Sequence, residues 1–327
     1  MNLNTKIHKL IKRNYRIHKL SFILFHAYTS LKHIFILNKY RFELINVLNS
    51  NLDVKTSEKI KLLDFISQKH YFDFNFDLTF PYDFVKKYNP FNIAVYHDEI
   101  NNMNYVLHNN KRLYFPKSYG KCLIQNIYNQ LLIEQDPDSP HKYVNNNFHV
   151  EKGDILIDAG ACEGFFALEN VENVEKIYLI EANEEWKEPL AKTFLPYKDK
   201  VEFVHKFVSN NNQEGKWRGI SYITLDKLLV DECNKNIFIK GDIEGFELNL
   251  LKGSKKLLQK NNVKLVLCTY HNQFDGRDIN NYLKSLGFET NFTKGYMLPL
   301  IEEFFNKIEY PYFRKGVIRA SKKIITS

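Results

Sequence analysis

An acid and two glycines stand close together in the segment LIDAGACEGFF, Leu156 to Phe166. An apolar run ends at Asp158, and Gly160 and Gly164 follow it. Glycines permit a sharp turn between a strand and a helix, and the first amides of that helix then face a bound ligand. The dinucleotide fingerprint would need a further glycine at position 162, where this chain has cysteine, and Asp158 would repel a pyrophosphate. The segment therefore favours a cationic ligand.

Glu181 is a second sign of such a ligand. It follows the apolar run KIYLI and stands 23 residues after Asp158. An acid about 20 residues beyond a glycine-rich turn is typical of a ribose-binding residue. S-adenosylmethionine carries a ribose, an ammonium and a sulfonium, so it fits both features, and we predict it as the cofactor. The predicted cofactor-binding residues are Asp158, Gly160, Ala161, Glu163, Gly164, Glu181, Ala182 and Ser209.

A third motif lies in IKGDIEGFELNLLKG, Ile239 to Gly253. After ITLDKLL, its residues have K-x-D-x-E-G-x-E spacing: Lys240, Asp242, Glu244, Gly245 and Glu247. The motif resembles the signature of FkbM-type methyltransferases. The resemblance covers about residues 150 to 320, including Glu181, Ser209 and His271, and departs at Gly241, where the family commonly has a bulkier apolar residue. It implies O-methyl transfer from S-adenosylmethionine to a hydroxyl, often on a sugar or a natural-product scaffold.

Asp242, His271 and Glu244 are the predicted catalytic residues. A hydroxyl is a poor nucleophile unless a base removes its proton or a metal acidifies it. Asp242 follows the apolar run NIFIKG and His271 follows VKLVLCTY, and the tips of adjacent parallel strands can converge. The same three residues would hold a divalent ion if one takes part. In the structural alternative, Asp242 caps the next helix and His271 bonds the backbone.

Two polar segments are candidates for the acceptor site. The turn-rich loop EQDPDSPHKY offers Gln135, Asp136, His141 and Tyr143, which would bind a polyhydroxylated substrate if the loop folds over the site. The segment GKWRGISY offers Trp217 and Arg218, which would stack on a sugar or bind a phosphate. The alternative for the first segment is a plain connecting loop, and the alternative for the second is a surface turn. The predicted substrate is a carbohydrate or a nucleotide sugar.

Predicted strands and helices, which must position these residues, alternate along the chain from Gly153 onward. Helical segments separate the β-branched runs ILIDAGA, KIYLIEA, VEFVHKFVS, NIFIKGD and VKLVLCTYH, which ends at His271; FETNF and GVIRAS follow. This order predicts an α/β fold of the class I methyltransferase (Rossmann-like) type, a mostly parallel sheet with helices on both faces. Ligands of such sheets bind beyond the carboxyl ends of the strands.

The chain before this domain has a different character. Apolar spacing predicts helices from roughly residue 5 to 70, and NYVLHNNKRLYFP predicts a β-hairpin that turns at Asn109 and Asn110. We therefore divide the chain into a basic amphipathic helical region (1–75), a β-hairpin and substrate-loop region (76–150) and an S-adenosylmethionine-binding domain (151–327).

Positive charge is concentrated at the N-terminus. The first 42 residues contain six lysines, three arginines and no acid, so they carry +9. The whole chain has a net charge of +8, so the rest of the chain carries about −1. A basic groove over the folded domain is therefore not expected, and we predict no nucleic-acid partner. The basic helix either lies on an anionic membrane or presents a solvated face. The apolar run from Leu20 to Leu37 contains His26, Lys32 and His33, so it predicts neither a membrane span nor a signal peptide.

Four widely spaced cysteines without a C-x-x-C pair indicate reduced thiols of a cytoplasmic protein, peripheral to the inner face of the membrane if the helix docks there. The sequence leaves the oligomeric state open.

Two other functions also remain open. One is a non-catalytic adaptor of a glycan-assembly complex that retains the fold. The other is a nicotinamide-dependent sugar oxidoreductase, which the missing glycine and the lack of a Tyr-x-x-x-Lys pair after the fourth strand disfavour.

Overall fold

The structure is a computed structural model that describes residues 45–46, 48–49, 56–68, 79–211, 216–217, 219–298 and 313–324. The chain divides into two compact units, Met1–Tyr82 with Leu300–Ile308, and Asp83–Pro299 with Glu309–Ser327. In the first unit, helix α3 (Thr56–Gln68) confirms the helical prediction for its residues. The rest of the predicted helical region lies outside the described residues, apart from helical positions 45–46 and 48–49.

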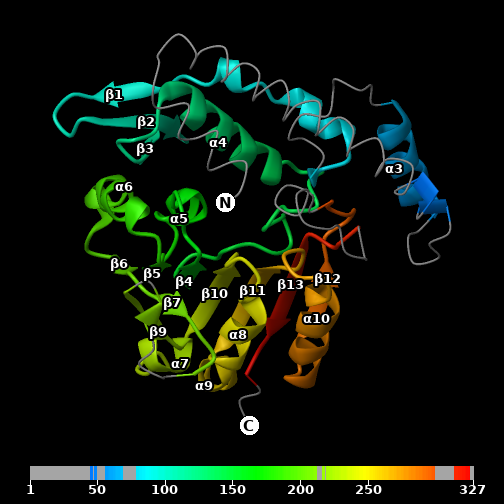
Figure 1. Ribbon diagram of the computed structural model, residues 1–327. Helices are drawn as coiled ribbons and strands as arrows, with labels where there is room; N and C mark the ends of the chain where they lie inside the picture. Colours follow the sequence, from blue (N-terminus) through cyan, green and yellow to red (C-terminus); the bar gives the residue numbers. More distant parts are fainter. Residues whose placement is uncertain are drawn as a thin grey trace, which may run out of the picture. The chain divides into compact units, whose positions relative to one another are not determined.

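The second unit is built on a seven-stranded sheet of order β12-β13-β11-β10-β4-β5-β6 (Figure 1). Its strands are β4 (Ile155–Ala159), β5 (Lys176–Ile180), β6 (Val201–Val204), β10 (Asn236–Gly241), β11 (Asn262–Cys268), β12 (Glu289–Phe292) and β13 (Val317–Lys322). The first five are parallel to one another, and β13 runs antiparallel to both β11 and β12. The predicted class I methyltransferase fold, with its mostly parallel sheet and a final strand pair, is confirmed.

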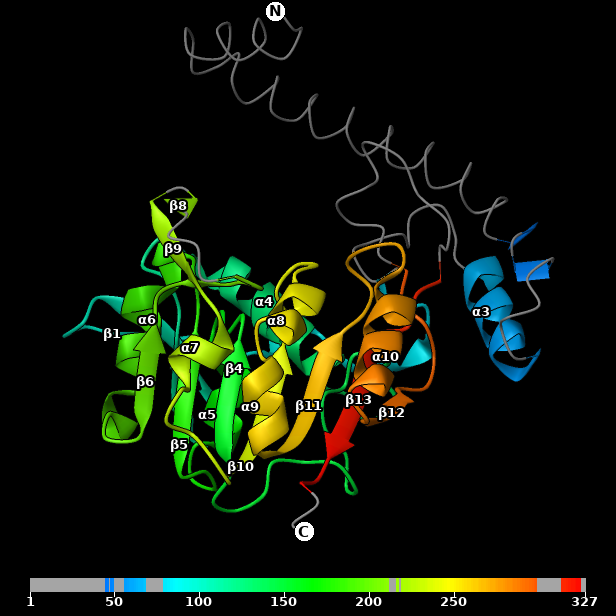
Figure 2. The ribbon, with the colours of Figure 1, turned by 90° about the horizontal axis from the view of Figure 1, so that it is seen from below.

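Helices cover both faces of this sheet, as successive strand residues require. In β4, Leu156 joins the core under α4 (Lys121–Glu134), α5 (Phe165–Asn170) and α6 (Lys187–Thr193). Its neighbours Ile155 and Ile157 join the core on the other face. That face carries α7 (Leu225–Leu228), α8 (Glu247–Lys252), α9 (Lys255–Lys260) and α10 (Asp275–Ser285), which lie in front of the sheet in Figure 2.

The predicted β-hairpin is confirmed and is part of a three-stranded sheet, β1 (Tyr96–Asp98), β2 (Met103–His108) and β3 (Lys111–Tyr114). Asn109 and Asn110 form its turn with φ of 49° and 63°, a conformation that asparagine tolerates. The short helices η2 (Asp83–Lys87) and η3 (Pro90–Asn92) precede it. Val106 and Leu113 of the hairpin join the core under α4 and α5, so this region folds in the same unit as the large sheet.

One predicted strand was wrong. The run VEFVHKFVS forms two strands, β6 and β7 (Phe207–Val208), because the chain bends after Val204. Strand β7 leaves the large sheet and pairs with β9 (Ile220–Ile223), which also pairs with β8 (Lys216–Trp217). Helices η4 (Glu184–Trp186) and η5 (Leu195–Tyr197) complete the elements around β5 and β6. All four cysteines are free thiols, and none of the helices in the described part of the chain has the length and apolarity to cross a membrane.

Candidate active site

Gly160 brings three strand ends together. It follows β4 with a φ of 73°, and a Cβ added there would stand 1.8 Å from the backbone oxygen of Asp242, just beyond β10. The amides of Gly160 and Ala161 both donate to the carbonyl of Ile180, the last residue of β5, at 2.9 and 3.2 Å. Only glycine satisfies both the left-handed conformation and the close approach. The predicted glycine turn therefore ties the tips of β4, β5 and β10.

Gly164 has a packing role in the structure. Its φ is 77°, and a Cβ there would stand 2.7 Å from Phe194 Cε2 and 2.8 Å from Leu190 Cδ2. The glycine thus lets α6 and the residue after it pack against the start of α5. Between the two glycines, Glu163 is half-buried, and burial raises its pKa to about 7. Whether either residue touches the cofactor stays a prediction.

Glu181 is held rigidly at the tip of β5. Its Oε1 accepts from the amide of Asn183 at 2.6 Å, and its Oε2 accepts from the amide of Cys162 at 2.9 Å. The residue is 7 % exposed, and Ala182 beside it is 9 % exposed. A carboxylate has about four acceptor positions, so two amide bonds leave room for hydroxyl donors such as those of a ribose. The arrangement fits the predicted ribose-binding role.

Asp158 already has a cationic neighbour. It is 1 % exposed in β4, beside Lys240 of β10 in the sheet register, and Lys240 Nζ lies 3.2 Å from its Oδ1. Lys240 also donates to the carbonyl of Gly160 at 2.5 Å. Burial raises the pKa of Asp158, and Lys240 opposes that rise. Lys240 therefore supplies the positive charge that the sequence assigned to the ligand, and contact of Asp158 with the cofactor stays a prediction.

Asp242 is the centre of a charged cluster. It lies directly after β10, two residues beyond Lys240. Tyr143 donates its hydroxyl to Asp242 Oδ2 at 2.7 Å, and Nε2 of His141 lies 3.6 Å from the same oxygen. Nε2 of His271 lies 3.4 Å from Oδ1. Burial would raise the pKa of Asp242, but Lys240, the two histidines and Tyr143 hold it well below the usual range.

His271 lies in the loop beyond β11, since that strand ends at Cys268 and the predicted strand was three residues too long. Its Nδ1 lies 3.0 Å from Glu247 Oε1, and its Nε2 faces Asp242. Burial would lower the pKa of His271, but Glu247, Asp242 and Glu244 together raise it to about 9. A proton on His271 is thus stabilised by carboxylates on both sides of the ring.

Glu247 is a site residue that the sequence did not single out as catalytic. It is fully buried at the start of α8, and its Oε1 also accepts from the amide of Ile243 at 2.9 Å. The motif K-x-D-x-E-G-x-E contained it, but spacing alone did not show that it would turn inward. Asp242, Glu247 and His271 offer ligand atoms that all lie within 4.8 Å of one another, so these described residues could hold a metal ion.

Glu244 points outward instead. Its side chain is 84 % exposed, with Oε2 3.7 Å from His271 Nε2. Glu244 and Gly245 have φ of 55° and 90°, and this left-handed turn reverses the chain between β10 and α8. Among the described residues, Glu247 replaces Glu244 in the metal-sized group with Asp242 and His271.

The predicted substrate loop divides into two parts. His141 and Tyr143 are buried against Asp242, and burial lowers the pKa of His141 to about 4. Asp136 instead accepts from the hydroxyl of Tyr88 at 2.6 Å and pairs with Lys87 at 3.3 Å.

Gln135 also has a local contact, because its side-chain oxygen accepts from the amide of Tyr143 at 3.1 Å. Ser209 follows β7 and bonds the carbonyl of Ile223 through its amide. Trp217 lies in strand β8, and Arg218 lies outside the described residues. The predicted roles of Gln135, Ser209, Trp217 and Arg218 stay predictions.

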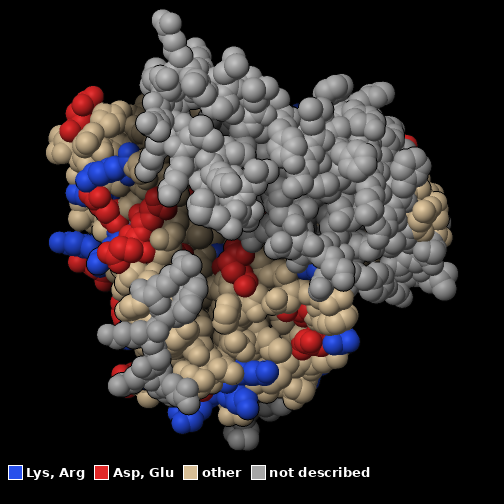
Figure 3. All heavy atoms as spheres, in the orientation of Figure 1, with Lys and Arg blue, Asp and Glu red and all other residues tan. Residues whose placement is uncertain are grey.

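Acidic side chains are prominent on the face shown in Figure 3, around η4 and α6 and at the tip of β10. Glu184, Glu185 and Glu188 are exposed in the first of these groups. Two of these glutamates have lysine partners, because Glu188 pairs with Lys117 at 2.6 Å and Glu184 pairs with Lys187 at 3.1 Å.

Residues 218–290 match the family model of the methyltransferase FkbM domain. The match includes β10, Asp242, Glu247 and His271, so the predicted resemblance to this family is confirmed for these residues. No protein of curated function matches the sequence.

Solved structures are similar at low identity. A methyltransferase FkbM from Methylobacillus flagellatus KT is 18 % identical with a TM-score of 0.43, over 62 % of this chain and 53 % of that chain. A precorrin-6y C5,15-methyltransferase from Geobacter metallireducens GS-15 is 14 % identical with a TM-score of 0.34, over 54 % and 84 %. A putative methyltransferase from Streptococcus mutans in complex with SAH is 16 % identical with a TM-score of 0.32, over 53 % and 91 %. The alignment spans about half of the M. flagellatus protein, and these similarities are too low to transfer an activity.

Proposed function

We propose that this protein is an S-adenosylmethionine-dependent O-methyltransferase of the cytoplasm that acts on a hydroxyl of a carbohydrate, either a nucleotide sugar or a surface polysaccharide. One observation carries the proposal. Asp242, paired with His271, lies at the same edge of the sheet as Glu181, in a chain whose residues 218–290 match the methyltransferase FkbM domain. An acid that can bind the ribose and a half-buried acid–histidine pair are two parts that such a reaction can use.

The residues at the tips of β4 and β5 fit the cofactor. Gly160 leaves no side chain between the three strand ends, and the two oxygens of Glu181 are oriented by backbone amides. When bound, S-adenosylmethionine supplies a methyl group on a sulfonium. Glu181 would accept hydrogen bonds from the ribose hydroxyls.

Asp242 is the base in this proposal. Its low pKa keeps it ionised at neutral pH, while the raised pKa of His271 keeps that ring protonated. The acceptor hydroxyl would donate to Asp242, and its proton would pass to that carboxylate as the oxygen becomes acidic during methyl transfer. Tyr143 orients the carboxylate through its hydroxyl, the charge of Lys240 favours the ionised form, and Glu247 holds His271 in place.

A divalent ion is the alternative means of making the acceptor hydroxyl acidic. Asp242, Glu247 and His271 would hold it and the acceptor oxygen would bind to it, which lowers the pKa of the hydroxyl. Treatment with a chelator separates the two mechanisms. Activity that is lost and then restored by Mg²⁺ supports the metal, and activity that is indifferent to the chelator supports proton transfer to Asp242.

Calorimetry tests the cofactor. The protein should bind S-adenosylmethionine and its demethylated product, but not NAD. Glu181→Ala should weaken binding of S-adenosylmethionine by about 1.5–3 kcal/mol, the scale of a hydrogen bond to a charged group. Glu184→Gln, an exposed acid three residues further on, is the control and should bind as the parent does. Equal affinity of the parent and Glu181→Ala would remove Glu181 from the site.

Mass spectrometry identifies the acceptor. Surface glycans and nucleotide sugars from cells with and without the gene should differ by one methyl group on a hydroxyl. If both pools are identical and the purified protein methylates neither, a carbohydrate acceptor is excluded.

A further inference from the structure

Three different ligand types meet at Oδ2 of Asp242, while His271 faces the other oxygen of that carboxylate. Nε2 of His141 lies 3.6 Å from Asp242 Oδ2 and 3.5 Å from Sγ of Cys268. One atom of each side chain belongs to a group whose members all lie within 4.8 Å of one another. His141 and Cys268 are buried, but the side chain of Asp242 is 20 % exposed, which leaves this group an entry.

The separations match those of ligands on a single zinc ion. Tetrahedral zinc has bonds of roughly 2.3 Å to sulfur and 2.0–2.1 Å to imidazole nitrogen or carboxylate oxygen, so neighbouring ligand atoms are roughly 3.3–3.6 Å apart. A thiolate with an imidazole favours zinc over Mg²⁺ and Ca²⁺, which prefer oxygen ligands. The group thus differs from that of Asp242, Glu247 and His271, which has no sulfur.

Hydrogen bonding satisfies only part of the polar contacts around His141. The hydroxyl of Tyr270 lies 3.2 Å from Nε2, in addition to Cys268 Sγ and Asp242 Oδ2. An imidazole nitrogen carries either one proton or one lone pair, so it satisfies one such partner at a time. A cation among these atoms would bind the nitrogen, the sulfur and the carboxylate together. The Tyr270 hydroxyl or a water would complete the four ligands of zinc.

The charges around the group suit a divalent cation. Glu134, at the end of α4, has its Oε2 4.0 Å from Nδ1 of His141, behind the ring as seen from Cys268. A carboxylate in this position is the usual partner of a ligating histidine. Burial raises the pKa of the Cys268 thiol, so an ion must displace its proton on binding. The thiolate and the Asp242 carboxylate then neutralise both charges of zinc, and the nearby charge of Lys240 meets a neutral group.

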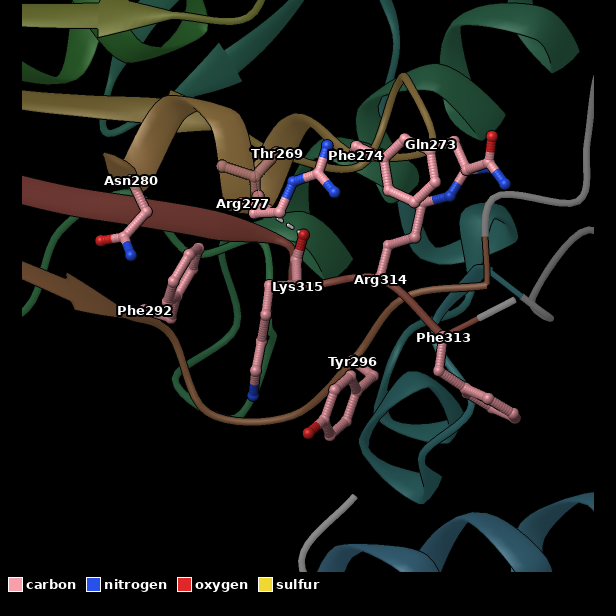
Figure 4. Close-up of a pocket in the computed structure, with 11 residues that line it drawn as sticks. Thr269, Gln273, Phe274, Arg277, Asn280, Phe292, Tyr296, Phe313, Arg314 and Lys315 are labelled. Carbon is pink, nitrogen blue, oxygen red and sulfur yellow. Dashed lines mark hydrogen bonds between the residues drawn. The ribbon is translucent and has the colours of Figure 1, made fainter. Parts of the chain in front are cut away.

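The backbone next to Cys268 is fixed by the segment before β13. Thr269, the following residue, donates to the carbonyl of Lys315 at 2.7 Å, a bond marked in Figure 4. Arg314, labelled in the same view, donates to the carbonyls of the next two residues at 2.8 and 3.0 Å. A ligand on a fixed backbone is already oriented when the ion arrives.

We propose that His141, Asp242 and Cys268 form a zinc site at the tips of β10 and β11. The ion takes Oδ2 of the carboxylate that serves as base in the proposed function, so bound zinc stops methyl transfer until it dissociates. Zinc binding does not depend on the proposed function, and only the inhibition rests on it.

Metal binding by the full chain, without cofactor or acceptor, tests the site. After incubation with zinc and dialysis, elemental analysis should find zinc bound to the protein. Cobalt in place of zinc should give the near-ultraviolet absorption band of a thiolate ligand. Cys268→Ser should abolish this band. His141→Gln should weaken zinc binding about 100-fold or more, because even the hydrogen-bond partners of ligands contribute about 10- to 100-fold.

Cys233→Ser is the matched control, because Cys233 is an exposed thiol before the opposite end of β10. It should keep both the zinc and the cobalt band. Absence of bound zinc overturns the inference, as does cobalt binding without a thiolate band or an equal loss in Cys233→Ser and Cys268→Ser. If Cys268→Ser is unfolded by circular dichroism, the cobalt spectrum of the parent and the zinc affinity of His141→Gln decide.

Two further measurements separate this site from the proposed function. Zinc-free samples are titrated with S-adenosylmethionine. If it binds and zinc does not, the proposed function stands without this site; if zinc binds and it does not, the proposed function fails and the zinc site remains. Turnover on a proven acceptor should fall when zinc is added and recover with a chelator, and unchanged turnover of the zinc-loaded protein would contradict the contact with Asp242.

Discussion

The side chains at the strand tips have charges that depend on their neighbours in space. Lys240 stands between Asp158 and Asp242, and Asp242 is also faced by His141 and His271. The positive groups keep Asp242 ionised in a half-buried place, where burial alone would favour the neutral acid. The cluster therefore maintains a carboxylate at the point where a hydroxyl would lose its proton.

Asp242→Asn tests this role at constant shape. Asparagine keeps the size of the side chain and the bond from Tyr143 but cannot take a proton, so turnover should fall by roughly 10² or more. Affinity for S-adenosylmethionine, measured by calorimetry, should change little. Glu244→Gln, on an exposed acid next to the cluster, should have a much smaller effect on turnover. Parental turnover of Asp242→Asn on a proven acceptor would place the base elsewhere.

Gly160→Ala tests the junction of the three strand tips. The new Cβ would lie 1.8 Å from the carbonyl oxygen of Asp242, so either the turn or β10 must shift. We expect a loss of unfolding free energy of roughly 3 kcal/mol or more, combining backbone strain with overpacking. Gly153→Ala is the control, with a φ of 86° and open space around the added Cβ, and should cost only about 1–2 kcal/mol. Urea denaturation measures both, and equal losses would disprove the clash.

At the scale of elements, the hairpin is fixed to the large domain by a buried histidine. His108, in β2, is 5 % exposed, and its ring lies 4.1 Å from that of Phe165 in α5. Its Nδ1 lies 3.0 Å from the hydroxyl of Tyr128 in α4. Burial, with a smaller effect of Lys111, lowers the pKa of His108 to about 4. Three elements thus meet around a neutral imidazole.

This histidine predicts a loss of stability in acid. Because the folded pKa of about 4 lies below the unfolded value of 6.5, the unfolded chain binds more protons between these pH values. Stability contributed by His108 is therefore present above pH 6.5 and falls toward pH 4, by up to about 1.4 kcal/mol per pH unit. His108→Leu should reduce the difference between urea midpoints at pH 7 and pH 5. His97→Leu, at a more exposed position of the same small sheet, should leave it unchanged; an unchanged difference in His108→Leu would contradict the assignment.

At the scale of the whole molecule, the basic segment and the predicted catalytic and cofactor-binding residues occupy different parts of the chain. The first 42 residues carry +9, whereas all predicted catalytic and cofactor-binding residues lie beyond residue 150. The match to the methyltransferase FkbM domain, residues 218–290, is also far from the basic segment. We therefore expect binding of the cofactor to be independent of the N-terminal charge.

A chain that begins at Ser21 should keep the parent's affinity for S-adenosylmethionine and its turnover on a soluble acceptor. If the basic segment docks on a membrane, the full chain should bind anionic vesicles in low salt and the shortened chain should not. Vesicle co-sedimentation at two salt concentrations measures this. Lack of binding by the full chain would assign the segment a packed or solvated role, and loss of turnover in the shortened chain would show that the segment contributes to the site.

The sequence by itself determined the order of elements and the positions of the strand-tip acids. Alternating β-branched and helical segments predicted the parallel sheet, and Asp158, Glu181 and Asp242 were placed at strand ends. These features depend on neighbours in the chain, because periodicity and turn chemistry are local. The bend that divides β6 from β7 was missed, since a continuous run of strand-forming residues gives no sign of where pairing partners change.

Only the tertiary structure decided which charges meet. Lys240 with Asp158, Glu247 with His271, and His141 with Asp242 are separated by 24 to 101 residues, so no spacing in the sequence relates them. Burial then sets their protonation, because removing water raises the energy of a lone charge and strengthens its attraction to a partner. The predicted loop residues divide in the same way: Gln135 accepts from the amide of Tyr143 and Asp136 accepts from the hydroxyl of Tyr88, while His141 and Tyr143 lie against Asp242.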